Sequence, residues 1–530
     1  MFRSSVTPDG FRVGVHKPFY RVANFRGPAG IRSLGRLADG TTVINERNFP
    51  EGDIEENAAR WIYEIANPFP FRGATYIDSD WAASRAERPE TIKVTARPGC
   101  SLISVLGEHV GMEALPALLK SLPRPVLYDL AANSTDPDEL VLLARNCCRF
   151  VVDDQDRPTG LVFVDGEQGP RADIDDFELF ETIANNPHLP DVYKEVMVLR
   201  PGVQGASEIM GEFRAGRTHV YEYLRRNSYI PWGHFAANMA EDAIRYRTSD
   251  LDVTDMQGLR HLYYQRTYAV LAAQLGLAVA SRGRELTPEE LEELRLRILA
   301  AVDDGVPAGS ATLWGWNFGY DFSGSGYRLH ASHQMIHQQY AMVPAQVETL
   351  DGNRMPAFGC GDQVADVVEQ YRREYGRDFF SDYLGAIRNN TRMDGRDLDA
   401  GLIVHEDESV ILFVPKAQVS QWEMQIMVIA DDAHGRPVGN VMEADTAVRR
   451  AIDRAILTAQ HVYAGMGAVM VTSIEYPKRL GLDNGQRLLY AFLPKLPWSM
   501  GAFSEAQQRF ICGHFPEDFA RAARDLLPTG

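Results

Sequence analysis

The chain has 530 residues, 45% of them hydrophobic and 24% charged, with a formal net charge of -18. This length predicts about two to four domains, and the negative charge argues against binding to nucleic acid or to an anionic membrane surface. Five cysteines without a C-x-x-C spacing indicate no disulfide framework and no cysteine zinc site, and the absence of a long apolar run or a secretory signal leads us to expect a cytoplasmic protein without a transmembrane segment.

The first 205 residues are expected to form an N-terminal extension that contains a small α/β unit. Up to about residue 90, turn-forming sequences such as TPDG and RGPAG separate short apolar pieces, so no regular element is assigned there. The patterns then predict strands at 91–96 and 125–130, a helix at 136–148, a strand pair at 149–154 and 160–166, and a strand at 194–198. A glycine-rich turn around Gly202 and Gly205 follows, which is either a structural turn or a phosphate-binding loop.

The remaining chain shows one order of elements twice. In the later copy, strands at 409–417 and 424–430 precede a helix at 443–463, and strands at 467–476 and 487–494 follow it. The apolar stripe of that helix consists of Val448, Ile452, Ala455, Ile456, Ala459 and Val462. The earlier copy has strands at 234–240 and 243–248, helices between 255 and 302, a strand at 311–318, a Gly/Ser-rich turn and a strand at 332–344.

This repeat predicts an α+β fold with two duplicated halves, each an antiparallel sheet with helices. The first half is expected over residues 206–355 and carries the histidines discussed below, and the second, histidine-poor half over residues 356–530. The charged segment 366–387 between the two copies is predicted to be helical.

Three histidines occur within eight residues in RLHASHQMIHQQYAMVP, which begins at Arg328. In a helix, His330, His333 and His337 would share one face and resemble a zinc site, although the metalloprotease pattern would need a glutamate where Gln334 stands. In a strand, the side chains of His333, His337 and Gln339 would share one face. The preceding turn and the repeat favour the strand.

On a strand, His337 is a candidate nucleophile, because a neutral imidazole attacks phosphorus near pH 7 and the phosphoramidate formed passes the group on. The amide of Gln339 would donate a hydrogen bond to a phosphoryl oxygen. The turn residues Ser323, Gly324 and Ser325 would bind the same phosphate through backbone N–H groups and hydroxyls. The alternative is that these histidines are ordinary core residues beside a loop.

The sequence MIHQQ after the turn NFGYDFSGSG, together with VILFVPKAQVSQWEMQI in the later half, resembles the histidine triad (HIT-like) superfamily. The most similar branch contains galactose-1-phosphate uridylyltransferase and the dinucleoside polyphosphate and GDP-sugar phosphorylases. The resemblance covers roughly residues 206–530. It implies duplicated α+β halves, a motif H-x-H-x-Q and a covalent nucleotidyl-histidine intermediate, and it also implies pairing into a homodimer.

Carried over residue by residue, the resemblance places the nucleophile on His337 and the phosphate-contacting glutamine on Gln339. The first histidine of the motif falls on Met335, a departure for which His333 would compensate. Asn317 matches the asparagine before the phosphate-binding turn. Because Met335 replaces a zinc ligand and the N-terminal C-x-x-C cysteines are missing, the resemblance implies that no cofactor is required and puts a structural zinc in doubt.

Several other residues are weaker candidates. Gln421 and Trp422 fall in a segment that, by the same resemblance, lies near the nucleotide, although core packing is an equal alternative for Trp422. Lys416 is interpreted as a solvated lysine at a strand end rather than a phosphate ligand, and His234 as a buried structural histidine.

The leading hypothesis is a nucleotidyltransferase or nucleotide phosphorylase. Its substrates would be a nucleotide or nucleotide sugar and a phosphate or sugar-phosphate acceptor. One alternative is a metal-dependent hydrolase that uses His330, His333 and His337, and another is a nucleotide-binding protein without turnover. The sequence specifies neither the base, nor the leaving group, nor the role of the first 205 residues.

Overall fold

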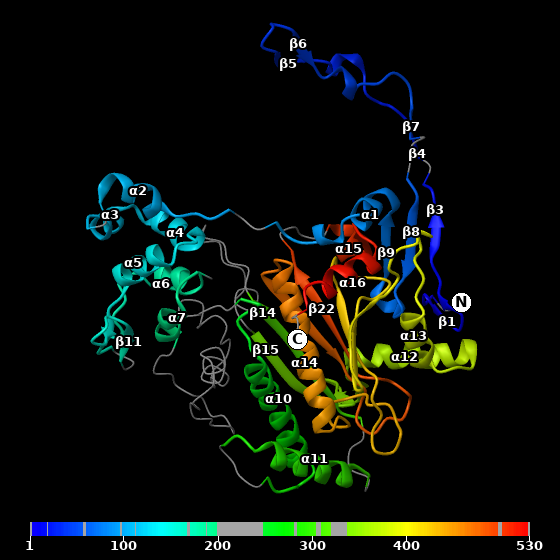
Figure 1. Ribbon diagram of the computed structural model, residues 1–530. Coiled ribbons are helices and arrows are strands. Elements are labelled where there is room, and N and C mark those ends of the chain that lie inside the picture. The colour runs from blue at the N-terminus through cyan, green and yellow to red at the C-terminus, as the bar shows by residue number, and fades with distance from the viewer. Residues whose placement is uncertain are drawn as a thin grey trace.

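The structure, a computed structural model, describes residues 3–18, 20–56, 60–95, 98–111, 113–166, 170–186, 188–198, 247–279, 284–303, 309–319, 337–496 and 501–527. These residues form helices and mainly antiparallel sheets, which confirms the α+β class. A seven-stranded sheet lies at the centre of the body, and a group of short helices from α2 to α7 lies to one side of it (Figure 1). Among the described residues no helix is long and apolar enough to cross a membrane.

The central sheet is antiparallel throughout and has the strand order β15-β14-β21-β22-β20-β19-β18. Its strands are β14 (Ala311–Gly319), β15 (His337–Val343), β18 (Ile403–Glu406), β19 (Val410–Phe413), β20 (Met424–Val428), β21 (Met470–Tyr476) and β22 (Leu489–Lys495). In β14 the alternate residues Trp314, Trp316 and Phe318 are buried, whereas Leu313 is exposed. This period of two is that of a strand with one well-covered face.

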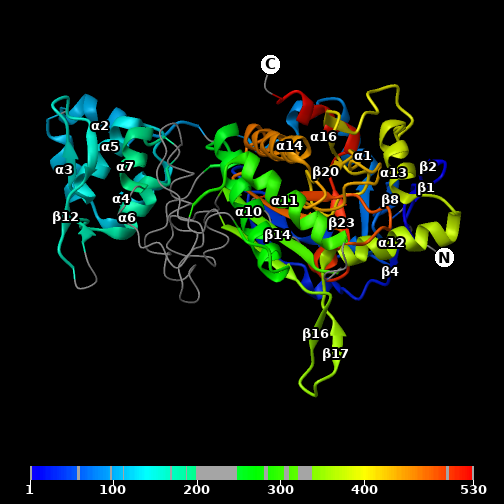
Figure 2. The same ribbon diagram turned by 90° about the horizontal axis from the view of Figure 1, so that it is seen from below.

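Two long helices, α10 (Val253–Gln274) and α14 (Thr446–Gly465), lie side by side over one face of the sheet (Figures 1 and 2). A capping carboxylate starts α14, because Asp445 accepts a hydrogen bond from the backbone N–H of Val448 at 2.9 Å. The six apolar residues predicted for the stripe of α14 are all buried. A third helix, α11 (Pro288–Asp303), packs against α10. The helices predicted in both copies are therefore confirmed.

A buried arginine joins these helices to the sheet. Arg260 of α10 is fully buried, and its Nε donates to Asp453 Oδ1 of α14 at 3.0 Å while its Nη2 donates to the Tyr490 hydroxyl of β22 at 3.0 Å. Four aromatic rings surround the guanidinium, with centroids at 4.6–5.4 Å from Cζ: Tyr263, Tyr264, Trp314 and Tyr490. Ion pairing, hydrogen bonding and cation–π contact together offset the cost of burying this charge.

The carboxylate of Glu475 in β21 is the acceptor for a second set of buried groups. It accepts from the hydroxyls of Tyr263 at 2.9 Å, Thr312 at 2.8 Å and Tyr490 at 2.6 Å. Since Tyr490 also receives a hydrogen bond from Arg260, the two sets share one tyrosine. The network thus connects α10 with β14, β21 and β22.

The opposite face of the sheet packs against α12 (Cys360–Tyr375) and α13 (Phe379–Arg388), which form the helical segment predicted at 366–387. Phe69, from the N-terminal part of the chain, inserts there with its ring centroid 5.4 Å from that of Phe379. Val6 and Phe413 belong to the same apolar cluster. Residues near the N-terminus therefore complete the core on this face.

The segment up to residue 90, for which no element was assigned, contributes strands to a second sheet of order β23-β9-β8-β3. These strands are β3 (Gly14–His16), β8 (Ile62–Ala66), β9 (Ala74–Asp78) and β23 (Arg509–Cys512). The C-terminal strand β23 pairs in parallel with the N-terminal strand β9. The sheet therefore joins both ends of the chain. An almost fully buried ion pair between Arg72 Nη1 and Glu423 Oε1, at 2.6 Å, connects the same N-terminal segment to the start of β20.

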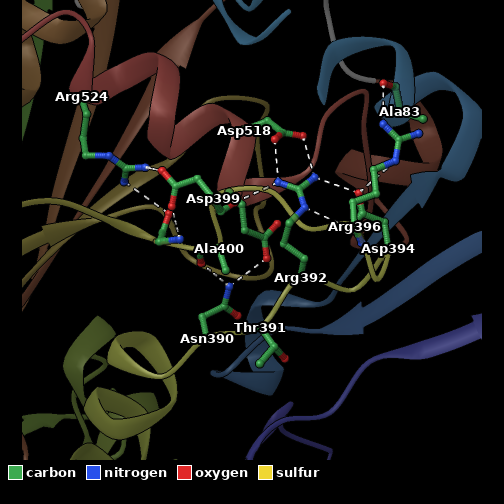
Figure 3. Close-up of polar contacts among 12 residues, drawn as sticks. Ala83, Asn390, Thr391, Arg392, Asp394, Arg396, Asp399, Ala400, Asp518 and Arg524 are labelled. Atoms are coloured by element: carbon green, nitrogen blue, oxygen red, sulfur yellow. Dashed lines mark hydrogen bonds and ion pairs between the residues drawn. The ribbon is translucent and has the colours of Figure 1, made fainter. Parts of the chain in front are cut away.

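Further ion pairs attach the C-terminal helix α16 (Pro516–Arg524), as Figure 3 shows. Arg392 is bidentate to Asp518, with Nη1 at 2.7 Å and Nη2 at 3.2 Å, and it also binds Asp394 at 2.8 Å. All three side chains are at most 7% exposed. Paired on both sides, the Arg392 guanidinium has a structural role.

His514 lies in the short connection between β23 and α16, where it is buried. Its ring contacts that of Phe519 edge to face at a centroid distance of 5.5 Å, and its Nε2 lies 3.4 Å from Gln418 Oε1. Burial, with the nearby charge of Arg85, lowers the pKa of His514 to about 3. The imidazole is therefore neutral in the folded protein throughout the physiological range.

Three strand predictions in the N-terminal extension were wrong. Residues 125–130 lie in helix α4 (Arg124–Asn133), residues 194–198 in helix α7 (Asp191–Val198), and residues 91–96 form no strand over the described part. In α4 the half-buried Leu127 and Leu130 and the buried Ala131 follow helical spacing, and Pro125 suits the first turn of a helix. A short run of mostly apolar residues was thus mistaken for a strand.

The other elements predicted in this region are confirmed in part. Helix α5 (Pro137–Cys147) occupies the predicted stretch, and β10 (Phe150–Val152) pairs antiparallel with β11 (Pro158–Leu161). The strand predicted at 160–166 is divided, because its residues 163 and 164 form β12 (Phe163–Val164), which pairs with β13 (Arg171–Ala172) instead. Both predicted strands at 234–248 and the turn around Gly202 and Gly205 lie outside the described residues, apart from 247 and 248. The duplication and the boundaries at residues 205 and 355 therefore stay predictions.

We predict that Arg260→Met lowers the free energy of unfolding by about 3–5 kcal/mol, because it leaves the buried Asp453 carboxylate without its counter-ion. Urea denaturation followed by tryptophan fluorescence measures the change. The control is Arg450→Met, which alters an exposed arginine on the same helix as Asp453 and should change stability by less than about 0.5 kcal/mol. Adding Asp453→Leu to Arg260→Met should restore part of the loss, and equal losses in the two single arginine variants would contradict this account.

A second prediction concerns the pH dependence of stability. Since His514 has a pKa of about 3 when folded and about 6.5 when unfolded, only the unfolded chain takes up a proton as the pH falls through that interval. Between about pH 7.5 and pH 5 the protein should thereby lose about 2 kcal/mol, and His514→Gln should lose that much less. Denaturation of both proteins across this range gives the comparison, in which parallel pH profiles would contradict the prediction.

Candidate functional site

The candidate site lies where β14 ends and β15 begins, at one edge of the central sheet. In the register of this pair, Asn317 is opposite His337, Gly315 is opposite Gln339, and Trp316 is opposite Gln338. Directly opposite residues of an antiparallel pair share a face of the sheet. The structure therefore brings Asn317 and Gln339, which are 22 positions apart, onto neighbouring strands of one face.

The alternation along β15 separates the two glutamines of the HQQ sequence. Gln338 Oε1 accepts a hydrogen bond from Trp314 Nε1 at 3.1 Å, and the Tyr340 ring lies 5.8 Å from that of Tyr263 on α10, so both point to the helix-covered face. Gln339 is exposed on the opposite face. The strand interpretation holds for these residues, and it leaves the Gln339 amide accessible to a ligand.

Asn317 is fixed by a third strand. Its Oδ1 accepts a hydrogen bond from Thr472 Oγ1 of β21 at 2.8 Å, which orients the amide, and its side chain is half-buried. The sequence pattern did not identify Thr472. Its contact with Asn317 arises from the pairing of β14 with β21, strands that are more than 150 residues apart in the sequence. No local sequence pattern predicts such a pairing.

The last residue of β14 allows a close backbone approach. Gly319 has φ +84°, and a Cβ built on it would lie 2.0 Å from the carbonyl oxygen of Val469. Only glycine fits such a position, where the left-handed conformation and the neighbouring backbone both exclude a side chain. The predicted Gly/Ser-rich turn starts at this residue, so the strand end and the beginning of the turn are fixed by sterics.

The remaining residues of the histidine stretch and its turn lie outside the described residues: Ser323, Gly324, Ser325, His330 and His333. His337 is described through its backbone pairing with Asn317. In the described part of the chain, no group of three or more His, Cys, Asp or Glu side chains is arranged to bind a metal ion.

Gln421 and Trp422 do not lie at the β14–β15 edge. They precede β20, which is separated from β14 by β22 and β21, so at about 4.8 Å per strand they are roughly 14 Å from Asn317. Trp422 is buried with φ +65°, and its carbonyl oxygen accepts from the Tyr463 hydroxyl at 2.6 Å. For Trp422 the structure favours the core-packing alternative.

The interpretation of Lys416 as a solvated lysine was wrong. Its side chain is 1% exposed, and Nζ donates to Glu517 Oε1 at 2.5 Å and to Asn390 Oδ1 and the Thr391 carbonyl at 2.9 Å. All three ammonium donors are therefore used within the protein. The error arose because the acceptors come from two distant segments that fold over the strand end. His234, which was interpreted as a buried structural histidine, lies outside the described residues.

A cavity of about 320 Å³ is present on the helix side of the body, between α10, α11 and α14. Its wall includes Thr254, His261, Tyr264, Arg449, Arg450 and Asp453. Burial raises the pKa of Asp453 to about 6, against the opposing effect of Arg260. Since Gln339 is exposed on the other face of the sheet, this cavity is not part of the candidate site at the β14–β15 edge.

No protein-family model and no curated protein matches this sequence. Among solved structures, it is similar to a galT-like protein from Arabidopsis thaliana, with 13% identity, a TM-score of 0.34 and coverage of 54% of this chain and 72% of that chain. It is also similar to an ADP-glucose phosphorylase from the same plant with bound ADP-glucose, with 11% identity, a TM-score of 0.34 and coverage of 53% of this chain and 69% of that chain. A uridylyltransferase matches with 12% identity, a TM-score of 0.31 and coverage of 46% of this chain and 69% of that chain. These scores are too low to assign the chain to a family.

Proposed function

We propose that the protein is a nucleotidyltransferase or nucleotide phosphorylase that acts on a nucleoside diphosphate derivative through a covalent nucleotidyl-His337 intermediate. The observation that supports it is the register of β14 and β15, which pairs Asn317 with His337 and places the exposed Gln339 on the next pair of the same face. A nucleophile and two amides at one strand end match the needs of phosphoryl chemistry, where positioning and oxyanion stabilisation matter most.

In the first step, an imidazole nitrogen of His337 attacks the α-phosphorus, a P–N bond forms, and the bond from this phosphorus to the leaving-group oxygen breaks. The leaving group departs as a phosphate or sugar phosphate with the electron pair of that bond. In the second step, an oxygen of the acceptor phosphate attacks the same phosphorus and the P–N bond breaks. The imidazole is regenerated, and no metal or redox cofactor is required for this exchange.

The two amides have different tasks in this scheme. Gln339 is the donor to a non-bridging oxygen of the α-phosphate, where negative charge develops in the transition state. Asn317, oriented by Thr472, positions the nucleophile strand and the start of the Gly/Ser-rich turn. The turn residues Ser323, Gly324 and Ser325 complete the phosphate site in this proposal.

We predict that His337→Ala abolishes formation of the covalent adduct and all transfer, because no other group in the scheme forms the P–N bond. The measurement is intact-protein mass spectrometry after incubation with nucleoside diphosphate sugars and dinucleoside polyphosphates. The unmodified protein should gain the mass of one nucleoside monophosphate, which also identifies the base. An adduct that persists in His337→Ala would contradict the assignment.

Gln339→Ala should lower the rate of transfer on the order of 10²-fold, the loss expected for one transition-state hydrogen-bond donor. The matched control is Gln338→Ala, one residue earlier. The Gln338 side chain accepts a hydrogen bond from Trp314 on the opposite face of the strand. This control should retain transfer within a few fold while losing some thermal stability. Equal loss of activity in both variants would contradict this role of the Gln339 amide, because any disturbance of β15 would then lower the transfer rate.

A further inference from the structure

The cavity between α10, α11 and α14 has walls formed by regular elements, whose positions Figure 2 shows. On α10 its lining residues run from Thr254 to His261, and on α14 from Thr446 to Asp453, in both cases at the spacing i, i+3, i+4 and i+7 of one helix face. The start of α11 and the residues just before it form the third wall. The volume of about 320 Å³ lies in the range of small-molecule sites.

Three polar groups on these walls have no hydrogen-bond partner among the described residues. The Asp453 carboxylate uses only Oδ1, which accepts from Arg260 Nε at 3.0 Å and from the Tyr264 hydroxyl at 2.7 Å, so Oδ2 has no donor there. Within the same part of the chain, the guanidinium of Arg450 and the amide of Gln257 form no ion pair or hydrogen bond. Since buried polar atoms normally have partners, the second oxygen of Asp453 is available to a ligand.

The three groups differ in depth. Asp453 is 4% exposed and lies at the floor, Gln257 is half-buried on the opposite wall, and Arg450 is exposed at the rim. Arg450 and Asp453 are three positions apart on α14, so their side chains lie on one helix face about one turn apart. A ligand that contacts both presents a negative group to the rim and a positive group, a few ångströms away, to the floor.

The charge of the walls indicates the class of ligand. Among the described residues that line the cavity, basic and acidic side chains are balanced: Arg449 and Arg450 against Glu285 and Asp453. Such walls favour neither a phosphate nor a polyamine, because each would meet as many like charges as opposite ones. A zwitterion with its two charges on neighbouring atoms matches them, and the buried Leu286 and Leu291 on the third wall suit an apolar group.

We propose that this cavity is a binding site for an α-amino acid with an apolar side chain. The guanidinium of Arg450 binds the carboxylate of the ligand, and the Gln257 amide donates a hydrogen bond to it from the opposite wall. Asp453 Oδ2 accepts from the ammonium group, and the apolar side chain packs against Leu286 and Leu291. Burial raises the pKa of Asp453 to about 6, which leaves the carboxyl mostly ionised at pH 7.5. This inference is independent of the proposed nucleotidyl transfer.

The test is isothermal titration calorimetry of the full chain at pH 7.5 with the standard amino acids, inorganic phosphate and spermidine as probes. At least one amino acid with an apolar side chain should bind with one site per chain, whereas phosphate and spermidine should not compete with it. The N-acetylated and the carboxamide forms of that amino acid should each bind at least about 10-fold more weakly, because each lacks one of the two charges. Equal binding of either form would overturn the proposal.

Arg450→Met and Gln257→Leu should each weaken binding about 10-fold, while thermal unfolding without ligand stays that of the wild type, since neither side chain has a partner among the described residues. The matched control is Arg454→Met, which changes a half-exposed arginine of α14 that pairs with Asp407 and does not line the cavity. It should bind the amino acid as the wild type does. The proposal fails if no amino acid binds at millimolar concentration, if Arg450→Met binds normally, or if phosphate or spermidine binds in place of the amino acid.

Discussion

The buried pair of Arg260 and Asp453 is the interaction on which the arrangement of the body depends. It ties α10 to α14, and through Tyr490 it ties both helices to the sheet. A charge at this depth is tolerated only when its partners are in place, so the helices have few alternative positions relative to the strands. The aromatic rings around the guanidinium fix the same geometry from the strand side.

The pairing of β14 with β21 has a comparable role for the candidate site. It joins β14 and β15 to the strands from β18 to β22 in one sheet, and through Thr472 it orients the amide of Asn317. The site edge is therefore supported from the interior of the sheet, whereas β15 lies at the end of the strand order. In the proposed function, a nucleophile on this edge strand is open to substrate, while the neighbouring strand β14 is paired on both sides.

Ion pairs with little exposure attach each end of the chain to the segment 392–423 in the body. Arg72 reaches Glu423, Arg392 reaches Asp518, and Lys416 reaches Glu517, each across a long stretch of sequence. Such pairs specify one arrangement more than they stabilise it, because an unpaired member would be costly. They place the N-terminal strands β8 and β9 and the C-terminal helix α16 on the body.

The sequence by itself determined elements such as α14 and β14, because their apolar periods are long and uninterrupted: α14 has its stripe from Val448 to Val462, and β14 has its alternating tryptophans. It also placed Gln339 and Gln338 on opposite faces of a strand, since the period of two needs no tertiary knowledge, whereas the packing of α10 decided which of the two faces is covered. It misjudged residues 125–130, where a short apolar run fits a helix as well as a strand. Only the tertiary structure decided that Thr472 meets Asn317, that Lys416 is buried and that Arg260 lies among four rings, because such contacts join distant segments whose partners no local pattern specifies.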